Sequence, residues 1–349
     1  MLTPEAYTLL TDYLTRYYDA PLYQQHGMSH PVIWYSASPE QATDIDSILG
    51  HFNQDLPSQD KMSFYNYAHL HTIQNSGRNL FNGTTYIMRR LRTNPLRIDG
   101  GFGTYFDMLA TCGALEIELL DVIERGMVRL PMRSQYHRDL DAQTSLTSGK
   151  GRSATIGGVM LTVFNDEGVY KAIVSQRTAQ HATDPNALHL LPAFIFQPMD
   201  KTRIASDWTF KHHLYREYLE ELVGMEEGDP DMNTHPAFKD LQAMEADGQA
   251  SIQLTGIAFN MLTLRPEIGA VLVVHDPTWW QAMQTGERGY SLQTPEATRA
   301  SLRYLPIADD EIVLSHLPEN YHLTMVPQAI PALWQGIESA RLLIATYDG

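Results

Sequence analysis

The sequence has very little cysteine and an excess of negative charge. Cys112 is the single cysteine among 349 residues, which excludes a disulfide within the chain and suits a reducing compartment. Its surroundings, MLATCGALEIEL, are typical of a packed helix, so we expect a buried core residue rather than a nucleophile. With 25 Lys and Arg against 41 Asp and Glu, the formal charge of −16 disfavours nucleic acid as a partner.

Long apolar runs are also absent. No stretch approaches the roughly 18 apolar residues of a membrane-spanning helix, and the N-terminus lacks a basic segment followed by an apolar one. We therefore expect no membrane partner and a cytoplasmic location. The chain has no internal repeat and no low-complexity tract, and its length favours about two domains.

Residues 1–145 predict an N-terminal α+β domain. Thr3 is a suitable cap for an amphipathic opening helix, and the stretch TTYIMRRLR alternates like a strand. A second helix is expected over 104–125, where apolar residues recur at helical spacing. The polar stretch DAQTSLTSGKGRS at 141–153 is typical of a linker or exposed loop, so we place the domain boundary near it.

Two patterns in this region suggest binding sites, but each has a simpler interpretation. The densest group of positive charges lies on the alternating strand, where it favours a polar strand face over a nucleic-acid patch; its members are Arg89, Arg90 and Arg92. Three glycines fit neither nucleotide-loop spacing and favour a hairpin or bulge; they are Gly100, Gly101 and Gly103.

Residues 151–349 predict a second domain in which strands and helices alternate. Strands are expected in ATIGGVMLTVF, VYKAIVSQRT and ASIQLTGIAFNMLTLRPEIGAVLVV, with a hairpin turn at NDEG. Helices are expected over 207–223, 236–247 and 294–302 and in the closing segment IPALWQGIESARLLIAT. Trp279 and Trp280 stand at the start of a further helix, where they are more often packing anchors than a stacking platform for a base.

The stretch REYLEELVG at 216–224 concentrates acids on one helix face. Glu217, Glu220 and Glu221 are three and four residues apart, so their carboxylates repel, and Arg216 cannot screen all three. One interpretation is a solvated surface face. The other is a divalent cation, because magnesium is typically held by one or two carboxylates and completed by waters and substrate phosphates.

The order of elements after residue 151, together with REYLEE, resembles the Nudix family. The box of that family runs G, five residues, E, seven residues, then R-E-U-x-E-E-x-G-U, where U is a bulky aliphatic residue. Arg216, Glu217, Glu220 and Glu221 match its second half. SQRT around Arg177 is similar to the end of the strand before the box, and LLP at 190–192 to the entry of its loop.

The first half of the box departs from the pattern. Trp208 stands where the first glutamate is expected, with Asp207 beside it as a substitute if the register shifts. Ala193 and Phe194 replace the glycines expected after LP, and Gly224 arrives one residue late.

The resemblance implies an α/β/α sandwich with a mixed sheet, behind the α+β N-terminal domain. It implies metal-dependent hydrolysis of a diphosphate linkage in a nucleoside diphosphate derivative, such as a nucleotide sugar or an ADP-ribose-like molecule. Mg²⁺ or Mn²⁺ would be held by the three glutamates, which Arg216 would orient. Arg177 and Arg265 are candidates for contacts to the substrate.

Several alternatives stay open. The degraded first half of the box also fits a module that binds a nucleotide ligand as a sensor without turnover, and an acidic interaction helix is a third hypothesis. Candidates for a general base are Glu267, Asp276 and Glu287. His181, His189, His212 and His213 match no common zinc spacing. A homodimer is left open.

Overall fold

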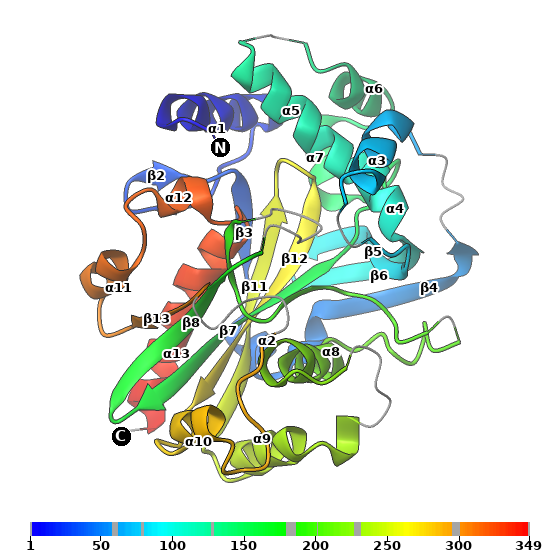
Figure 1. Ribbon diagram of the computed structural model, residues 1–349. Helices are drawn as coiled ribbons and strands as arrows, with labels where there is room; N and C mark the ends of the chain where they lie inside the picture. Colours follow the sequence, from blue (N-terminus) through cyan, green and yellow to red (C-terminus); the bar gives the residue numbers. More distant parts are fainter. Residues whose placement is uncertain are drawn as a thin grey trace.

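The computed structural model describes residues 2–57, 62–77, 80–126, 129–178, 186–200, 202–226, 232–294 and 301–347. An eight-stranded sheet occupies its centre (Figure 1). Its strands are β3 (Val32–Ser36), β7 (Gly157–Asp166), β8 (Val169–Gln176), β9 (Leu188–Leu190), β10 (Ala193–Ile195), β11 (Ala250–Asn260), β12 (Arg265–Val274) and β13 (Leu302–Pro306). Six of them lie in the order β13-β8-β7-β12-β11-β3, while β9 pairs with β8 and β10 with β7.

The sheet is mixed. β7 and β12 run parallel, whereas β7–β8, β11–β12 and β3–β11 are antiparallel. Residues 157–164 of β7 are all buried, as expected for a strand that is covered on both faces. The predicted hairpin turn after β7 is confirmed, because Glu167 and Gly168 both have positive φ, which a two-residue hairpin turn requires.

Helices cover both faces of this sheet. α8 (Phe210–Glu217), α9 (Pro236–Ala246) and α10 (Trp279–Thr285) share one hydrophobic cluster with Ile268 and Leu272 of β12. α13 (Ala329–Tyr347) shares the other cluster with Val271 and Val273, which point to the opposite face. α11 (Asp310–His316) and α12 (Tyr321–Thr324) connect β13 to α13. The predicted α+β class with a mixed sheet is confirmed.

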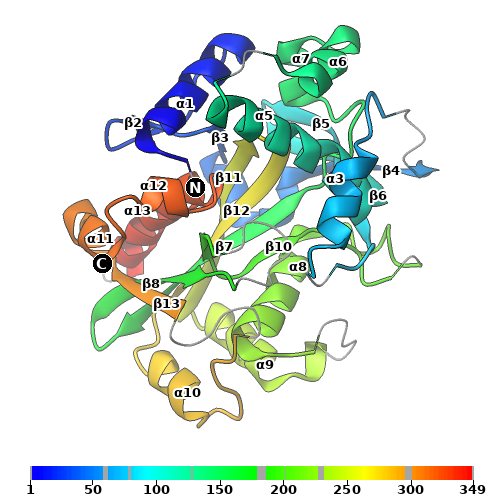
Figure 2. The same ribbon diagram turned by 45° about the horizontal axis from the view of Figure 1, so that its top comes forward.

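The N-terminal part consists mainly of helices around a three-stranded sheet, β4-β6-β5. Its elements are α1 (Pro4–Tyr18), β1 (Gln24–Gln25), β2 (Met28–Ser29), α2 (Pro39–Thr43), the 3₁₀ helix η1 (Ile45–Ile48), β4 (Leu49–Pro57), α3 (Tyr67–Gln74), β5 (Thr84–Thr93), β6 (Leu96–Thr104), α4 (Tyr105–Met108), the π-helix η2 (Leu109–Gly113), α5 (Ala114–Glu124), α6 (Pro131–Asp139) and α7 (Ala142–Thr147). Figure 2 shows α1, α5, α6 and α7 at one end of the central sheet and α8, α9 and α10 at the other.

The two parts of the chain share a sheet and a core. β3 extends the central sheet by pairing with β11, from Val32 opposite Asn260 to Ser36 opposite Gly256. One hydrophobic cluster contains side chains from both parts, including Leu115 and Phe210. A division of the chain near residue 145 therefore stays a prediction.

The expectation of an exposed linker at 141–153 is wrong. Asp141 caps α7 by accepting a hydrogen bond from the N–H of Thr144 at 2.8 Å. Arg152 is buried and donates to the carbonyls of Ser145 and Leu264 at 3.0 and 2.9 Å. The polar residues of this stretch cap a helix and place a buried guanidinium among backbone carbonyls. Composition alone does not distinguish such a packed polar segment from a solvated loop.

The helix expected over 104–125 is present, although its second turn is the π-helix η2. Cys112 lies on η2 and is fully buried, which confirms its assignment to the core. Most of the helix expected over 294–302 falls outside the described residues, because 295–300 are not described, and β13 begins at Leu302. In the described part of the chain, no helix is long and apolar enough to cross a bilayer.

Gly100, Gly101 and Gly103 lie within β6, and its pairing with β5 shifts register between Met88 and Arg90, where β5 carries one extra residue. The ring of Trp208 packs on Gly100, and a Cβ atom at that position would overlap the ring. Gly100 therefore permits the contact between β6 and the segment that leads into α8.

We expect Gly100→Ala to destabilise the protein by about 1–3 kcal/mol, because overpacking forces side chains or backbone to move. Equilibrium urea denaturation measures the change. Gly83→Ala is the matched control, since a Cβ atom there would have its nearest neighbours at 3.5 Å. Equal losses in the two variants would contradict the close approach of Trp208.

His30 lies buried at the start of β3, and its Nδ1 is 2.9 Å from the hydroxyl of Tyr7 on α1. Burial, together with the nearby His322, lowers the pKa of His30 to about 4. The folded state therefore keeps His30 neutral at a pH at which an unfolded histidine, with a pKa near 6.5, is protonated.

Between about pH 6.5 and 4 the unfolded state binds a proton at His30 that the folded state does not. The free energy of unfolding should therefore be highest above about pH 6.5 and fall as the pH drops toward 4. The slope from this one group is at most about 1.4 kcal/mol per pH unit. Urea denaturation between pH 4 and pH 8 should show a shallower dependence for His30→Gln than for the wild type. Parallel curves would show that His30 does not cause the dependence.

Candidate functional site

The acidic stretch lies on a helix that changes type in its middle. α8 ends at Glu217, and the π-helix η3 continues from Tyr218 to Val223. Gly224 then ends the helix in the left-handed region, with a φ of 75°, and donates its N–H to the carbonyl of Leu219, five residues back. A π turn contains one residue more than an α turn, which accounts for the late position of Gly224.

The interpretation of the acids as a solvated surface face is wrong. Glu217 and Glu221 are 7% and 8% exposed, and the side chain of Glu220 is 12% exposed. The helix also buries large apolar residues around much of its circumference; these are Phe210, Leu214, Tyr218, Leu219 and Leu222. Because neighbouring segments cover the helix on most of its sides, its acids are largely buried with it.

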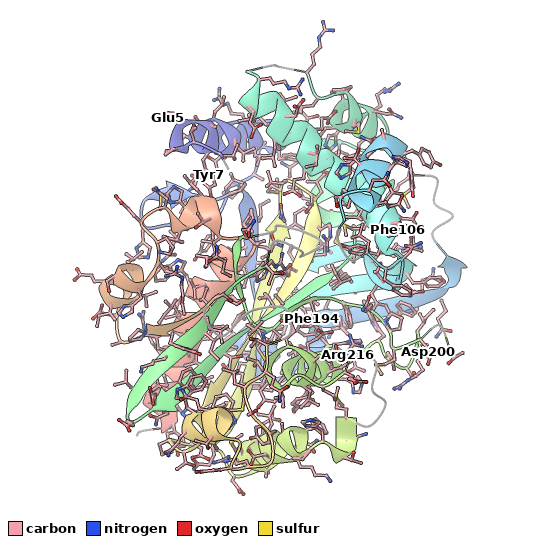
Figure 3. All side chains as sticks on the ribbon, in the orientation of Figure 1. Glu5, Tyr7, Phe106, Phe194, Asp200 and Arg216 are labelled. Atoms are coloured by element: carbon pink, nitrogen blue, oxygen red, sulfur yellow. The ribbon has the colours of Figure 1, made fainter. Side chains whose placement is uncertain are left out.

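Arg216 is the cation next to these acids. Its Nη2 lies 2.7 Å from Glu217 Oε1, and its Nε lies 3.7 Å from Glu220 Oε1. On its other side, Nη1 donates to the carbonyl of Gln197 at 3.3 Å. Burial disfavours the charged form, but the two carboxylates outweigh burial and raise the pKa of Arg216 above its usual value. Figure 3 shows Arg216 on α8.

Glu221 is held by the loop that precedes α8 in the chain. Its Oε2 accepts a hydrogen bond from the backbone N–H of Ala193 at 3.0 Å. Ala193 begins β10, at a position where the resemblance expects a glycine. The structure therefore groups Arg216, Glu217 and Glu220, and it connects Glu221 to the edge of the sheet.

The donor chemistry of the site suits a hard cation, since all three acids offer carboxylate oxygens. Among the described residues, no three His, Cys, Asp or Glu side chains come together as a group that could hold a metal ion. Magnesium held by one or two carboxylates and completed by substrate phosphates does not require such a group.

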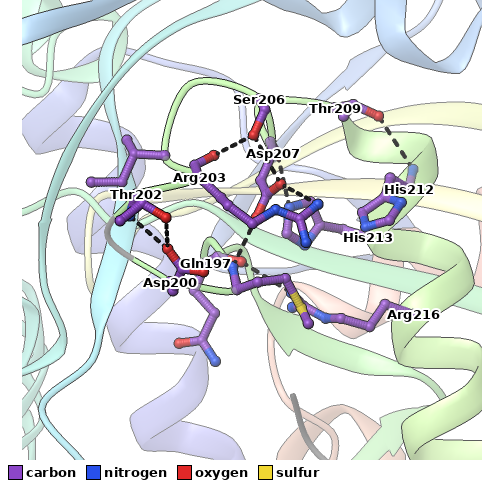
Figure 4. Close-up of polar contacts among 12 residues, drawn as sticks. Gln197, Asp200, Thr202, Arg203, Ser206, Asp207, Thr209, His212, His213 and Arg216 are labelled. Carbon is purple, nitrogen blue, oxygen red and sulfur yellow. Dashed lines mark hydrogen bonds and ion pairs between the residues drawn. The ribbon is translucent and has the colours of Figure 1, made fainter. Parts of the chain in front are cut away.

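Position 208 does not supply an acid, and Asp207 is engaged by other partners. Asp207 is buried; its Oδ2 accepts from the N–H of Met199 at 3.0 Å, and its Oδ1 lies 3.0 Å from Nη2 of Arg203 (Figure 4). The carbonyl of Asp207 lies 2.9 Å from Nε2 of His213. Burial lowers the pKa of His213 well below its usual value, so this ring is neutral.

The two arginines proposed to contact substrate lie on other elements. Arg265 donates from Nε to the carbonyl of Thr155 at 2.9 Å, and its Nη1 lies 3.5 Å from the sulfur of Met108 on α4. It therefore contacts the N-terminal part of the chain. Arg177 is half-buried just after β8, and its backbone N–H donates to the carbonyl of Ala187. A role in substrate binding stays a prediction for both.

The candidates for a general base have different surroundings. Glu267 is buried on β12, 3.8 Å from Nε2 of His189, and it accepts from Nε2 of Gln328 at 3.2 Å. Asp276 pairs with Arg288; burial raises its pKa, but hydrogen bonds from Arg288 and Thr278 more than offset this and lower it.

Glu287 is exposed. Of the three, Glu267 is the buried acid with a histidine beside it, and the sequence spacing gave no signal for its partner Gln328.

His181 lies outside the described residues. Trp280 stacks on Phe164 with ring centroids 4.1 Å apart, which supports its role as a packing anchor.

We expect Arg216→Met to destabilise the protein by about 3–5 kcal/mol, because it removes the cation beside the buried carboxylates of Glu217 and Glu220. Urea denaturation measures the loss. Arg125→Met is the control, since Arg125 pairs with Asp121 on an exposed helix face and should cost less than about 1 kcal/mol. A loss for Arg216→Met no larger than that of the control would contradict the buried ion-pair network.

Comparison with known proteins gives similarity to solved structures only. No family model and no curated protein matches the chain. The NUDIX domain of Shewanella oneidensis NrtR, crystallised with ADP ribose, is 11% identical; the match covers 54% of this chain and 89% of that one, with a TM-score of 0.31.

Two further structures are similar at the same level. A bifunctional NMN adenylyltransferase/ADP ribose pyrophosphatase of Francisella tularensis, with AMP and manganese, is 11% identical over 53% of this chain and 42% of that one, with a TM-score of 0.32. The Nudix hydrolase RenU of M. smegmatis is 11% identical over 55% and 88%, with a TM-score of 0.26. Two of the three bear the name of the family that the sequence resembles.

Proposed function

We propose that the protein is a metal-dependent Nudix-type hydrolase that cleaves a diphosphate linkage in a nucleoside diphosphate derivative, such as a nucleotide sugar or an ADP-ribose-like molecule. The observation that carries the proposal is one helix that buries Glu217 and Glu221 and leaves the side chain of Glu220 only 12% exposed, with Arg216 beside Glu217 and Glu220. Burying charge is costly unless it is paired or coordinates a metal, so a cluster of this kind is expected to have a use.

In this proposal Glu217, Glu220 and Glu221 are the candidate ligands of Mg²⁺ or Mn²⁺, of which one or two hold the ion while waters and substrate phosphates complete its coordination. When bound, the metal supplies charge neutralisation at the phosphates and lowers the pKa of a water molecule. Arg216 keeps Glu217 and Glu220 in place, and the N–H of Ala193 does the same for Glu221. Phosphoryl transfer depends mainly on positioning and electrostatics, so these contacts are the contribution expected from the protein.

The remaining parts of the proposal concern partners and location. The partner is a small nucleotide ligand. The buried Cys112, with no second cysteine in the sequence, supports a reducing compartment such as the cytoplasm. The net charge of −16 supports a partner other than nucleic acid.

Phosphorus NMR of a pooled substrate panel tests the activity. The panel contains nucleoside diphosphate sugars, ADP-ribose, dinucleotides and nucleoside triphosphates, with Mg²⁺ or Mn²⁺. We expect metal-dependent cleavage of one class by the wild type. Loss of a group that merely orients a metal ligand costs 10–100-fold, so Glu221→Gln should reduce the rate by at least about that factor.

The variants separate loss of activity from loss of folding. The amide oxygen introduced by Glu221→Gln can still accept from the N–H of Ala193, so this variant and the double variant Glu220→Gln/Glu221→Gln should remain folded by circular dichroism. Glu338→Gln, on the exposed side of α13, should keep full activity. If the wild type cleaves no member of the panel but shifts or broadens the signals of one, the site binds a ligand without turnover and the proposed hydrolysis is wrong.

A further inference from the structure

The N-terminal end of α8 is capped by a carboxylate from a distant part of the chain. Asp46 lies on η1, and its Oδ1 accepts from the backbone N–H groups of Phe210 and Lys211 at 2.6 and 3.0 Å. Its Oδ2 accepts from the hydroxyl of Thr209 at 3.2 Å. The first N–H groups of a helix have no partner within the helix, so Asp46 satisfies donors that would otherwise be unpaired.

Thr209 is the local cap of the same helix, because its hydroxyl accepts from the N–H of His212 at 3.3 Å. Two residues therefore cap α8: Thr209 accepts from the N–H of His212, and Asp46 accepts from those of Phe210 and Lys211. Its partners lie 163 to 165 residues further along the chain, so the contact exists only in the folded protein.

Two more contacts attach the segment before α8 to the N-terminal part. Trp208 donates from Nε1 to the carbonyl of Gly50 at 3.1 Å, and its ring contacts those of Phe52 and Phe196, with centroids 5.1 and 5.3 Å away. The hydroxyl of Tyr86 on β5 donates to the carbonyl of Ile204 at 2.7 Å. The residue that replaces the first glutamate of the box thus forms part of this attachment.

The charges along this helix are distributed so that a carboxylate at its N-terminal end is favourable. Glu217, Glu220 and Glu221 lie in the second half of the helix, toward its negative end, where the helix dipole disfavours carboxylates. Asp46 lies at the positive end, where a carboxylate is favoured. α8 spans eight residues before the π turn begins, so an anchor at Phe210 and Lys211 lies about two turns from Glu217 and about three from Glu220 and Glu221.

We propose that Asp46 is a positioning residue for the acidic helix, through which the N-terminal part of the chain fixes where Glu217, Glu220 and Glu221 lie. The metal and activity readouts of this inference rest on the proposed function, whereas the exchange readout does not. The N-terminal part is in this view a component of the site.

The test uses the full-length protein and the variants Asp46→Ala, Asp46→Asn and Asp309→Ala. Asp309 caps α11 by accepting from the N–H of Ile312 at 2.8 Å. Asp309→Ala therefore removes a carboxylate cap, as Asp46→Ala does, but from a helix that carries none of the three glutamates. The readouts are amide hydrogen exchange by peptide, and Mn²⁺ binding followed by the relaxation rate of water protons.

We expect Asp46→Ala to speed exchange across 210–217 and 218–226 and to weaken Mn²⁺ binding about tenfold, the lower end of the range for groups that orient metal ligands. Asp46→Asn keeps an acceptor oxygen and should have a smaller effect. Asp309→Ala should speed exchange only around 310–316 and leave Mn²⁺ binding unchanged. For Asp46→Ala, the metal concentration required for half-maximal hydrolysis should rise by the same factor of about ten.

Two results would overturn the inference. In the first, Asp46→Ala speeds exchange only at 209–213 and leaves 216–223 unchanged, which would make Asp46 a local cap. In the second, Asp309→Ala weakens Mn²⁺ binding as much as Asp46→Ala does. If the wild type neither binds Mn²⁺ nor cleaves the panel, the proposed function fails, and exchange at 216–223 still decides the role of Asp46.

Should Asp46→Ala fail to fold, Thr209→Val replaces it in the same assays. That variant removes the hydroxyl that donates to Asp46 and accepts from His212, and it leaves the carboxylate in place. Faster exchange at 216–223 in Thr209→Val supports the inference, and unchanged exchange there in both Thr209→Val and Asp46→Asn overturns it.

Discussion

The placement of three largely buried carboxylates on one helix is the constraint on which the rest of the site depends. A buried carboxylate is tolerated only with a counter-charge or hydrogen-bond donors, since desolvation of an unpaired ion costs several kcal/mol. Arg216 serves Glu217 and Glu220, and the backbone of Ala193 serves Glu221. The segment from β10 to Gln197 therefore has to lie against α8, because it supplies both the donor to Glu221 and an acceptor for Arg216.

The π-helix explains how this chain keeps the acids although its spacing departs from the family pattern. A strictly α-helical turn would bring Gly224 to a different point around the helix axis. The wider turn from Tyr218 to Val223 absorbs the extra residue and still lets Gly224 end the helix in the left-handed region. The extra residue before Gly224 thus changes only the local helix type and leaves the order of the surrounding elements intact.

The segments before and after the start of α8 have separate physical roles in this protein. The helix carries the acids and Arg216. The segment before it packs onto the N-terminal part, through Trp208 on Gly100 of β6, and Asp46 of η1 caps the start of the helix. This division agrees with the shared core and with β3 lying in the central sheet, because both make the N-terminal part continuous with the rest of the structure.

The sequence by itself determined the features that depend on neighbours along the chain. Periodicity, caps and turn residues predicted α1, β5, β7, β8, α9 and α13, the burial of Cys112 and the gathering of acids on one helix. Only the tertiary structure decided that these acids are buried, that 141–153 is packed, and that β3 joins the central sheet. Burial and hydrogen-bond partners are set by segments far apart in sequence, as Asp46 and Phe210 show, whereas periodicity and turn chemistry report only the nearest residues.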